Sequence, residues 1–484
     1  MTKLEMLFAA LQAFLSEGHM IRETTVESGK IEGLPADDPR VTVFRGIPFA
    51  APPVGKNRWR APQPCEHWDG VRQCCRFAPI SMQDRPGIED GLYEREFHVD
   101  PDIAISEDSL YLNVWTGAKS TDERLPVLVW IYGGAFQWGY TAEMEFNGER
   151  IARHGVVVVS IAYRLGVFGF LAHPDLDAED GAHPTNFGLL DQQAGLAWVY
   201  RNIAAFGGDP GNITLAGQSA GGASVTYAMA NPENLHMIKK ATVFSGFIRN
   251  PFYFDGIISP RMIEDVKKSG IEFIKSLGCS SVEEARNISA PAIVDAYLDF
   301  AKDHPRFVPC IDGVYVKEDP FAMMLEGKMP DIPMFTGYTQ DEFIDKLPKH
   351  RDDAERILKA DIIEKSGIKM FNVVQDSVRT IVDAHAQNGY KAPIYTYRFA
   401  IDVPGKDAPG VFHSCDLWFF FETIQKCWRP YSGAHYELAR KMCDYWCNFI
   451  KRSDPNGPGY DGKELPKWIE SAGDDRAKEE MLFK

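Results

Sequence analysis

A serine between closely spaced glycines is the first residue whose setting could support nucleophilic chemistry. Ser219 is the centre of Gly217-Gln218-Ser219-Ala220-Gly221, a G-x-S-x-G pattern. The apolar segment Ile213-Thr214-Leu215 precedes the pattern, and a run of small residues follows it. A strand, a sharp turn and a helix in that order would hold the hydroxyl above a sheet edge, beside the positive end of the helix dipole. The setting therefore predicts an activated serine rather than an incidental one in a glycine-rich turn.

A second glycine-rich segment could stabilise the negative charge that develops on a carbonyl oxygen when a serine attacks it. The segment Trp130-Ile131-Tyr132-Gly133-Gly134-Ala135-Phe136 ends an apolar run and opens a loop. Glycines let the backbone approach a substrate and point N–H groups at it. In this layout the upstream loop supplies donors, and the residue after the serine supplies another. We therefore expect an oxyanion hole made by the backbone N–H groups of Gly134, Ala135 and Ala220.

A serine nucleophile also needs a histidine base and a carboxylate that orients it, and the expected chain order is serine, acid, histidine. Six histidines follow Ser219, namely His236, His304, His350, His385, His413 and His435. His385 and His435 lie in helix-like segments, whereas His413 follows a Pro-Gly turn and precedes an aromatic run. The residues alone favour His413 and leave the acid open.

The segments around these residues alternate between strand and helix patterns. Continuous apolar runs at 125–132 and 156–162 are typical of parallel strands that are covered on both faces. Residues 143–154 and 186–205 have helical patterns, and a further helix is expected from Ala220. Shorter strands are expected at 41–44, 110–115, 212–216, 333–336 and 393–399. The alternation predicts an α/β fold, with a large, mostly parallel central sheet and helices on both faces.

Helical patterns dominate two regions, at about 250–330 and 345–390, which we expect to be helical insertions over the active site. No flexible linker separates them, so residues 20–484 are expected to form a single catalytic domain. Residues 1–19 are predicted to be an amphipathic extension without the features of a secretory signal. The extension could dock on the protein's own surface, bind a membrane or a partner, or be a tag or cloning remnant ending at Gly18-His19-Met20.

Composition excludes several classes of function. The formal net charge of −16 disfavours nucleic acid as a partner. No apolar stretch approaches the roughly 18 residues of a membrane span. The nine cysteines lack the paired spacing of a zinc site, so we expect no metal and no other cofactor. The expected protein is a monomer or small homo-oligomer that acts on a small molecule.

Longer motifs resemble the type B carboxylesterases, the family that also contains the cholinesterases. The resemblance covers roughly residues 25–470 and rests on the Ser219 turn and on four motifs, Phe44 to Ala50, Ser106 to Asn113, Asn186 to Gln192 and Phe206 to Pro210. The loop from Tyr132 to Phe136 looks most like bacterial members of the para-nitrobenzyl-esterase kind. The resemblance implies an α/β-hydrolase fold and a serine carboxylesterase without cofactors. A lipase, an amidase or carbamate hydrolase, and a non-catalytic binding module are the alternatives.

The resemblance also implies which residues act as acid and base. The family's acid is usually a glutamate in a short motif after a strand, and Gly337-Tyr338-Thr339-Gln340-Asp341-Glu342 matches that motif. This match selects Glu342, with Asp341 as its rival. The family's histidine lies in a G-x-x-H-x-x-D/E-L motif, which Gly410 to Leu417 matches, and this selects His413.

The sequence departs from the family's pattern at two places, and the resemblance has one further implication. Family members from secretory compartments carry a disulfide at the positions of Ser81 and Ser109, so its absence here favours a cytoplasmic protein. Gln218 stands where glutamate is common before the nucleophile. The resemblance further implies two structural ion pairs, Arg45 with Glu107 and Arg164 with Asp191.

We expect an apolar substrate pocket beside these catalytic residues. Aromatic side chains near the motifs are the candidates for its walls: Phe136, Trp138, Phe412, Trp418, Phe419 and Phe421. Such a pocket favours carboxylic esters of apolar, aryl or alkyl alcohols.

Overall fold

The structure, a computed structural model, describes residues 20–484 except 89–90, 181–183, 249–259, 343–372 and 472–479. The predicted amphipathic extension at 1–19 lies outside the described residues. The larger part of the predicted helical region at 345–390 also lies outside them, and its described end is the helix α14 (Val373–Gln387).

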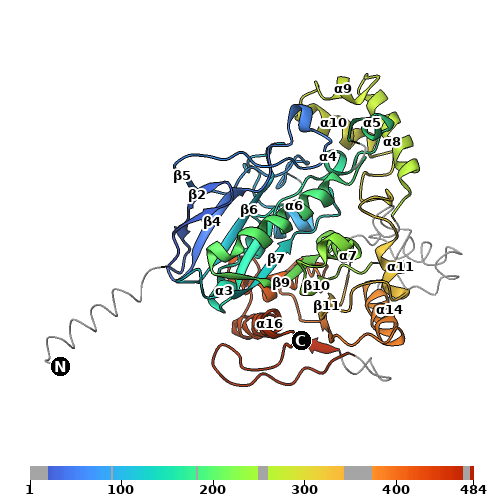
Figure 1. The fold of residues 1–484 in the computed structure, drawn as a ribbon. Helices are drawn as coiled ribbons and strands as arrows, with labels where there is room; N and C mark the ends of the chain where they lie inside the picture. The colour runs from blue at the N-terminus through green and yellow to red at the C-terminus, as the bar shows by residue number, and fades with distance from the viewer. Residues whose placement is uncertain (1–19, 89–90, 181–183, 249–259, 343–372, 472–479) are drawn as a thin grey trace, which may run out of the picture.

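A large twisted sheet forms the centre of the molecule (Figure 1). Within the described residues ten strands follow the spatial order β13-β12-β11-β10-β9-β7-β8-β6-β4-β3. Every pair from β13 to β8 is parallel, and β6, β4 and β3 continue the sheet in antiparallel pairs. Their bounds are β3 (Leu34–Pro35), β4 (Thr42–Pro48), β6 (Tyr111–Thr116), β7 (Leu125–Ile131), β8 (Val157–Ile161), β9 (Gly208–Gln218), β10 (Lys240–Phe244), β11 (Met334–Thr339), β12 (Ile394–Phe399) and β13 (Met481–Phe483). The predicted α/β class is confirmed.

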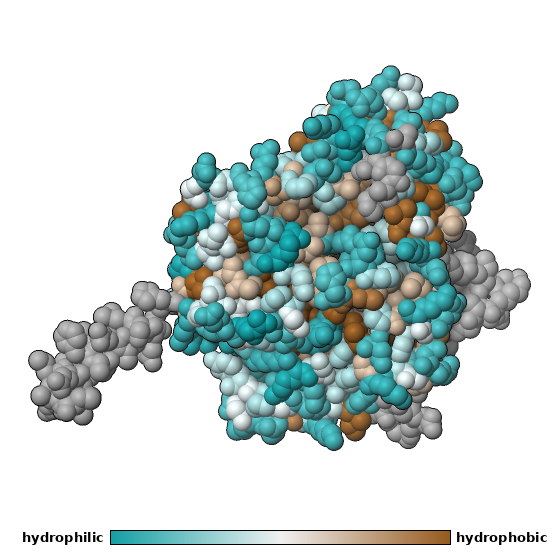
Figure 2. All heavy atoms as spheres, in the orientation of Figure 1, coloured by the Kyte–Doolittle hydropathy of each residue, from teal (hydrophilic) through white to brown (hydrophobic). Residues whose placement is uncertain are grey.

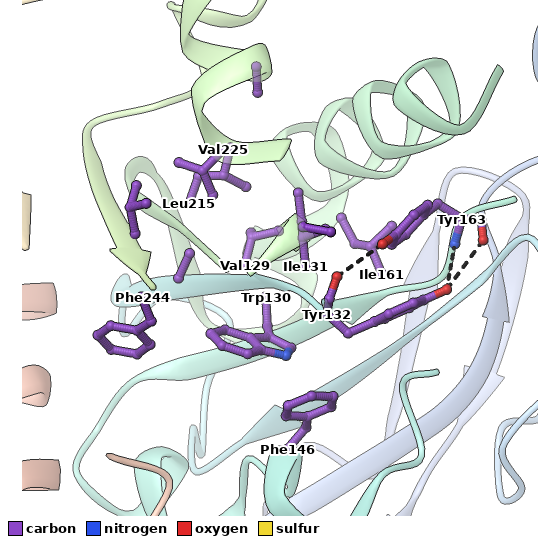
Figure 3. Close-up of a cluster of buried hydrophobic side chains, with 14 of the residues drawn as sticks. Val129, Trp130, Ile131, Tyr132, Phe146, Ile161, Tyr163, Leu215, Val225 and Phe244 are labelled. Atoms are coloured by element: carbon purple, nitrogen blue, oxygen red, sulfur yellow. Dashed lines mark hydrogen bonds between the residues drawn. The ribbon is translucent and has the colours of Figure 1, made fainter. Parts of the chain in front are cut away.

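The apolar runs of the sequence form the middle of the sheet, where helices cover both faces. Figure 3 shows Val129 and Leu215 on the side of the helices, with Val225 of helix α7 (Ala220–Ala230) packed over them. Trp130 points to the opposite face, where its ring lies 6.2 Å from that of Trp446 in helix α16 (Gly433–Arg452). Alternate residues of β7 therefore pack on opposite faces of the sheet, which explains the lack of polar alternation in this strand.

Other helices surround this sheet. Helix α6 (Phe187–Asn202) lies beside α7 over the sheet (Figure 1). Figure 1 shows that α5, α8, α9 and α10 gather at one end of the molecule. The remaining α-helices of the described residues are α2 (Leu92–Glu96), α3 (Glu149–Arg153), α4 (Gly166–Phe170), α5 (Pro174–Asp180), α8 (Ile263–Ser276), α9 (Val282–Ala285), α10 (Ala290–Phe300), α11 (Pro320–Leu325) and α15 (Leu417–Phe420). Helices α8 to α11 lie within the region expected to be helical at about 250–330, whereas the helical insertion and the single domain over 20–484 stay predictions.

A small second sheet near the start of the chain was not expected from the sequence. It pairs β1 (Glu23–Val26) with β2 (Gly29–Glu32) in antiparallel fashion, and β2 with β5 (Val71–Gln73) in parallel. Hydrophilic residues cover most of the face drawn in Figure 2, and apolar residues form scattered groups. None of the helices in the described residues is long and apolar enough to cross a lipid bilayer.

One of the two expected ion pairs is correct and the other is wrong. Arg164 and Asp191 form a buried pair with a nitrogen–oxygen distance of 2.6 Å. Glu107, however, pairs with Arg58, whose Nε and Nη2 each lie 2.6 Å from a carboxylate oxygen. Arg45 instead places its guanidinium 5.0 Å from the ring centre of Phe77. Arg58 makes a bidentate pair, because its Nε and Nη2 each donate to one oxygen of the same carboxylate, and this is the strongest geometry for such a pair.

Candidate active site

Ser219 occupies a strained turn between β9 and α7. Its φ and ψ angles are 56° and −124°, which only a tight local fold maintains in a non-glycine residue. A Cβ atom on Gly217 would collide with the backbone carbonyl of Gly221, and one on Gly221 would collide with that of Ile131. The two glycines of the motif are therefore sterically required. The turn leaves Ser219 half-buried at the start of α7, as its motif predicted.

The loop after β7 lies against this turn. A Cβ atom on Gly133 would come within 3.1 Å of the Ser219 Cβ, so the loop backbone runs directly beside the serine. Gly134 and Ala135 both have positive φ angles, 100° and 53°. None of the hydrogen bonds found among the described residues uses the N–H groups of Gly134, Ala135 or Ala220. Three backbone donors near one serine are thus available to a ligand oxygen.

Two glutamines hold this loop in place. The side-chain amide of Gln83 donates to the carbonyl of Gly139 over 3.0 Å and accepts from its N–H over 2.9 Å. The amide of Gln137 donates to the carbonyl of Phe307 and accepts from the hydroxyl of Tyr297. The second set ties the loop to the helical region around α10. Nothing in the sequence motifs pointed to Gln83, because its partner is a backbone group that is distant along the chain.

His413 and Glu342 meet at the ends of different elements. Nδ1 of His413 contacts Oε2 of Glu342, and both side chains are buried. The other carboxylate oxygen, Oε1, accepts a 2.6 Å hydrogen bond from the hydroxyl of Ser245 and a 2.9 Å bond from the N–H of Thr339. Both oxygens of Glu342 are therefore occupied, which fixes the carboxylate against the imidazole.

Asp341, the rival acid, has a different set of contacts. Its Oδ2 accepts a 2.8 Å hydrogen bond from the N–H of Val411, and its own N–H donates to the carbonyl of the same residue. Asp341 thus ties the end of β11 to the loop that carries His413. Its neighbour Glu342 is the carboxylate that touches the imidazole.

The opposite edge of the imidazole faces Gln218. Nε2 of Gln218 lies 3.0 Å from Nε2 of His413 and donates a 2.7 Å hydrogen bond to the hydroxyl of Ser414. His413 and Ser219 line the same cavity, as do Gly134 and Ala135. His385 and His435, the two candidates that lie in helices, are not among the residues that line it.

This cavity has a volume of about 90 Å³. It adjoins a wider groove of about 1000 Å³, and the two share Tyr93, His98 and Trp138. The described residues that line the cavity are Tyr93, Phe97, His98, Gly133, Gly134, Ala135, Trp138, Glu143, Glu145, Phe146, Gln218, Ser219, His413, Ser414 and Leu417. A small reactive chamber thus opens toward a larger space that could hold the remainder of a substrate.

Of the six aromatic residues expected in the pocket wall, only Trp138 lines this cavity. The other five, Phe136, Phe412, Trp418, Phe419 and Phe421, are completely buried in the core. Phe421, for example, packs edge-to-face on Trp130 at 4.9 Å, and Phe419 packs on Phe399 at the same distance. The aromatic residues that do line the cavity include Tyr93 and Phe97, from a segment without a motif. Proximity to a motif along the chain did not distinguish a cavity wall from the core.

A family model described as the carboxylesterase family matches residues 21–376 and 358–482, and the chain belongs to this family. It has the α/β-hydrolase fold and is a serine carboxylesterase.

Its relatives include the para-nitrobenzyl esterase of Bacillus subtilis, which is 31% identical over 90% of this chain and 92% of its own length. The fumonisin B1 esterase of Sphingopyxis macrogoltabida is 34% identical over 90% of this chain and 83% of its own. Among solved structures, a carboxylesterase of Geobacillus stearothermophilus is 30% identical with a TM-score of 0.74, over 93% of this chain and 94% of that one.

Proposed function

We propose that Ser219, His413 and Glu342 form the catalytic triad with which this carboxylesterase hydrolyses esters of apolar, aryl or alkyl alcohols. The observation that carries the proposal is the contact of Glu342 with Nδ1 of His413 at the wall of the cavity that holds Ser219. A carboxylate at Nδ1 fixes the tautomer in which Nε2 can accept a proton from the serine. The chain order of serine, acid and histidine agrees with this assignment.

The reaction follows from these positions as two acyl transfers. Ser219 Oγ attacks the ester carbonyl while His413 takes its proton, and the carbonyl oxygen becomes an oxyanion. The unused N–H groups of Gly134, Ala135 and Ala220 hold that oxyanion. The oxyanion collapses, the C–O bond to the alcohol breaks, and His413 gives the alcohol its proton. Water then attacks the acyl-enzyme by the same route and releases the acid.

The strained backbone around Ser219 supports this assignment. The positive φ angles of Ala135 and Ser219 each cost about 1–3 kcal/mol, and such strain concentrates at functional sites. Here it places unpaired donors beside a nucleophile before substrate arrives. Removing one oxyanion donor commonly costs roughly 100- to 1,000-fold in rate, so this arrangement is a large part of the catalytic effect.

Hydrolysis of 4-nitrophenyl butyrate by the Ser219→Ala variant tests the proposal. We expect kcat to fall at least about 1,000-fold, because the oxyanion hole alone retains only a small part of the catalysis. Ser276→Ala, which removes a hydroxyl that bonds the backbone of α8, is the matched control and should keep its activity. A Ser219→Ala enzyme that retained more than a few per cent of the rate would contradict the proposal.

We further propose that the protein is a bacterial enzyme of the reducing cytoplasm and works as a monomer or small homo-oligomer. All nine cysteines are free thiols. Where secretory relatives would carry a disulfide, the hydroxyls of Ser81 and Ser109 hydrogen-bond over 3.0 Å instead. Fractionation of the source cells and sedimentation of the purified protein test the two parts, and a purely extracellular protein would contradict the first.

A further inference from the structure

Two buried carboxyl groups line the same cavity as Ser219 without a place in the proposed acyl transfer. Glu143 and Glu145 are 6% and 1% exposed. Both residues lie in the segment that follows the loop with Gly134 and Ala135, and Glu145 belongs to the 3-10 helix η2 (Met144–Phe146). Buried carboxyls are uncommon unless a partner compensates them, so their surroundings in the cavity matter.

Glu143 has its partners within the protein. Its Oε1 accepts a 2.7 Å hydrogen bond from the N–H of Tyr140, and its Oε2 lies 3.5 Å from Nε2 of His98. Burial alone lowers the pKa of His98, but the charge and hydrogen bond of Glu143 outweigh burial and raise it. Glu143 therefore favours the protonated form of His98.

The carboxyl group of Glu145 is only partly hydrogen-bonded. It shares a hydrogen bond with Glu143, whereas its Oε2 has no hydrogen-bond partner among the described residues. Burial, followed by the neighbouring negative charge of Glu143, raises the pKa of Glu145 well above its usual range. The cavity wall thus holds two carboxyl groups beside His98, and one oxygen of Glu145 lacks a donor among the described residues.

We propose that Glu145, supported by Glu143, recognises a protonated primary amine on the substrate of the esterase. A primary ammonium carries three N–H donors and no acceptor, which suits an unpaired carboxyl oxygen. Its positive charge would let Glu145 release its proton and would balance the second carboxylate. The aromatic walls Tyr93 and Trp138 also tolerate a cation, because ring faces attract positive charge. This inference rests on the proposed function, since it concerns the cavity at Ser219.

Two series of matched esters test the inference. The first comprises phenyl butyrates that carry an aminomethyl, hydroxymethyl or ethyl group in the para position, so that size varies little while charge and donors change. The second comprises methyl benzoates with the same three para substituents. We expect kcat/KM of the wild-type enzyme to be at least about 30-fold higher for the aminomethyl than for the ethyl ester in one series. The series that shows it identifies the half of the ester that faces Glu145.

Variants of Glu145 test whether its carboxyl group causes the preference for the aminomethyl ester. Glu145→Gln keeps the shape of the side chain, and we expect it to lower the ratio of aminomethyl to ethyl kcat/KM at least tenfold. Glu145→Leu should lower the ratio further. Asp444→Asn removes another buried carboxyl, outside the cavity, and should leave the ratio unchanged. Because each enzyme is judged by a ratio, partial loss of folded protein does not affect the result.

Three results would overturn the inference. These are an ethyl ester as good as its aminomethyl counterpart in both series, a hydroxymethyl ester as good as the aminomethyl ester, and an unchanged ratio in Glu145→Gln. Hydrolysis of unsubstituted phenyl butyrate that depends on Ser219 reports the proposed function separately. An enzyme that hydrolyses this ester without preferring the amine would refute the amine site alone.

Discussion

The hydroxyl of Ser245 donates a 2.6 Å hydrogen bond to Oε1 of Glu342, while the other oxygen of that carboxylate contacts His413. Ser245 follows β10 directly, and Glu342 follows β11, the next strand of the sheet. The hydrogen bond therefore ties the acid to the neighbouring strand end. Ser245 does not line the cavity, so its effect on catalysis must pass through Glu342.

Ser245→Ala should lower kcat without changing KM. A hydrogen bond to a charged group contributes about 1.5–3 kcal/mol, which corresponds to a fall of roughly 10- to 100-fold if the whole effect is felt in the transition state. The measurement is steady-state hydrolysis of 4-nitrophenyl butyrate, with Ser276→Ala as the control. An equal rise in KM would show that Ser245 shapes the substrate site instead of positioning the acid.

Gln218→Glu should move the acidic limb of the kcat/KM profile to higher pH. A carboxylate 3.0 Å from Nε2 of His413 would favour the protonated imidazole, which cannot act as a base. The enzyme would then need a higher pH to reach the same fraction of free base. Profiles for 4-nitrophenyl butyrate hydrolysis check this, and Gln63→Glu, an exposed site with the same charge change, should not shift. A shift to lower pH would contradict the observed contact.

Ser81→Cys combined with Ser109→Cys should form a disulfide under oxidising conditions. The two hydroxyl oxygens lie 3.0 Å apart, so sulfur atoms in their place need little backbone movement. Closing this loop should stabilise the protein by roughly 2–4 kcal/mol. The melting temperature of the double variant with and without dithiothreitol measures the effect. A variant whose thiols remain free after oxidation would show that the side chains diverge.

Asp416→Asn should become more stable relative to the wild type as pH rises. Burial raises the pKa of Asp416 to about 7 from an ordinary value of 3.8, although the hydroxyl of Tyr397 donates to it. Between those values the unfolded chain has lost this proton and the folded chain keeps it, so the wild type loses stability with rising pH. The stability gap should widen by about 1.4 kcal/mol from pH 6 to pH 8 and then level off. Urea unfolding across this range measures it, and a constant gap would contradict the burial of the charge.

The middle of the sheet could be predicted from sequence because burial on both faces leaves a continuous apolar signal. The runs predicted at 125–132 and 156–162 are β7 and β8 within one residue at each end. The helix expected at 143–154 is instead a 3-10 turn followed by α3. Asn147 separates the two, because its backbone is extended, with φ −62° and ψ 112°. The local helical pattern of the sequence does not reveal this break.

Some residues of the candidate site could be predicted from the sequence and others could not. The residue pattern itself indicated Ser219 and favoured His413, whereas Glu342 was selected only by the resemblance to the family's motif. Ser245 contacts Glu342, which lies 97 residues further along the chain, and such a contact leaves no local pattern. The prediction for Trp418, Phe419 and Phe421 was wrong because these side chains are buried in the core, in or directly after the short helix α15.

Labelling with a fluorophosphonate tests the assignment of Ser219 as the nucleophile most directly. Such a probe phosphonylates a serine that a base activates, with loss of fluoride, so peptide mass spectrometry of the labelled enzyme identifies the residue. We expect one adduct, on Ser219, and labelling at least about 1,000-fold slower in His413→Gln. An adduct on a different serine, or unchanged labelling of Ser219→Ala, would contradict the account.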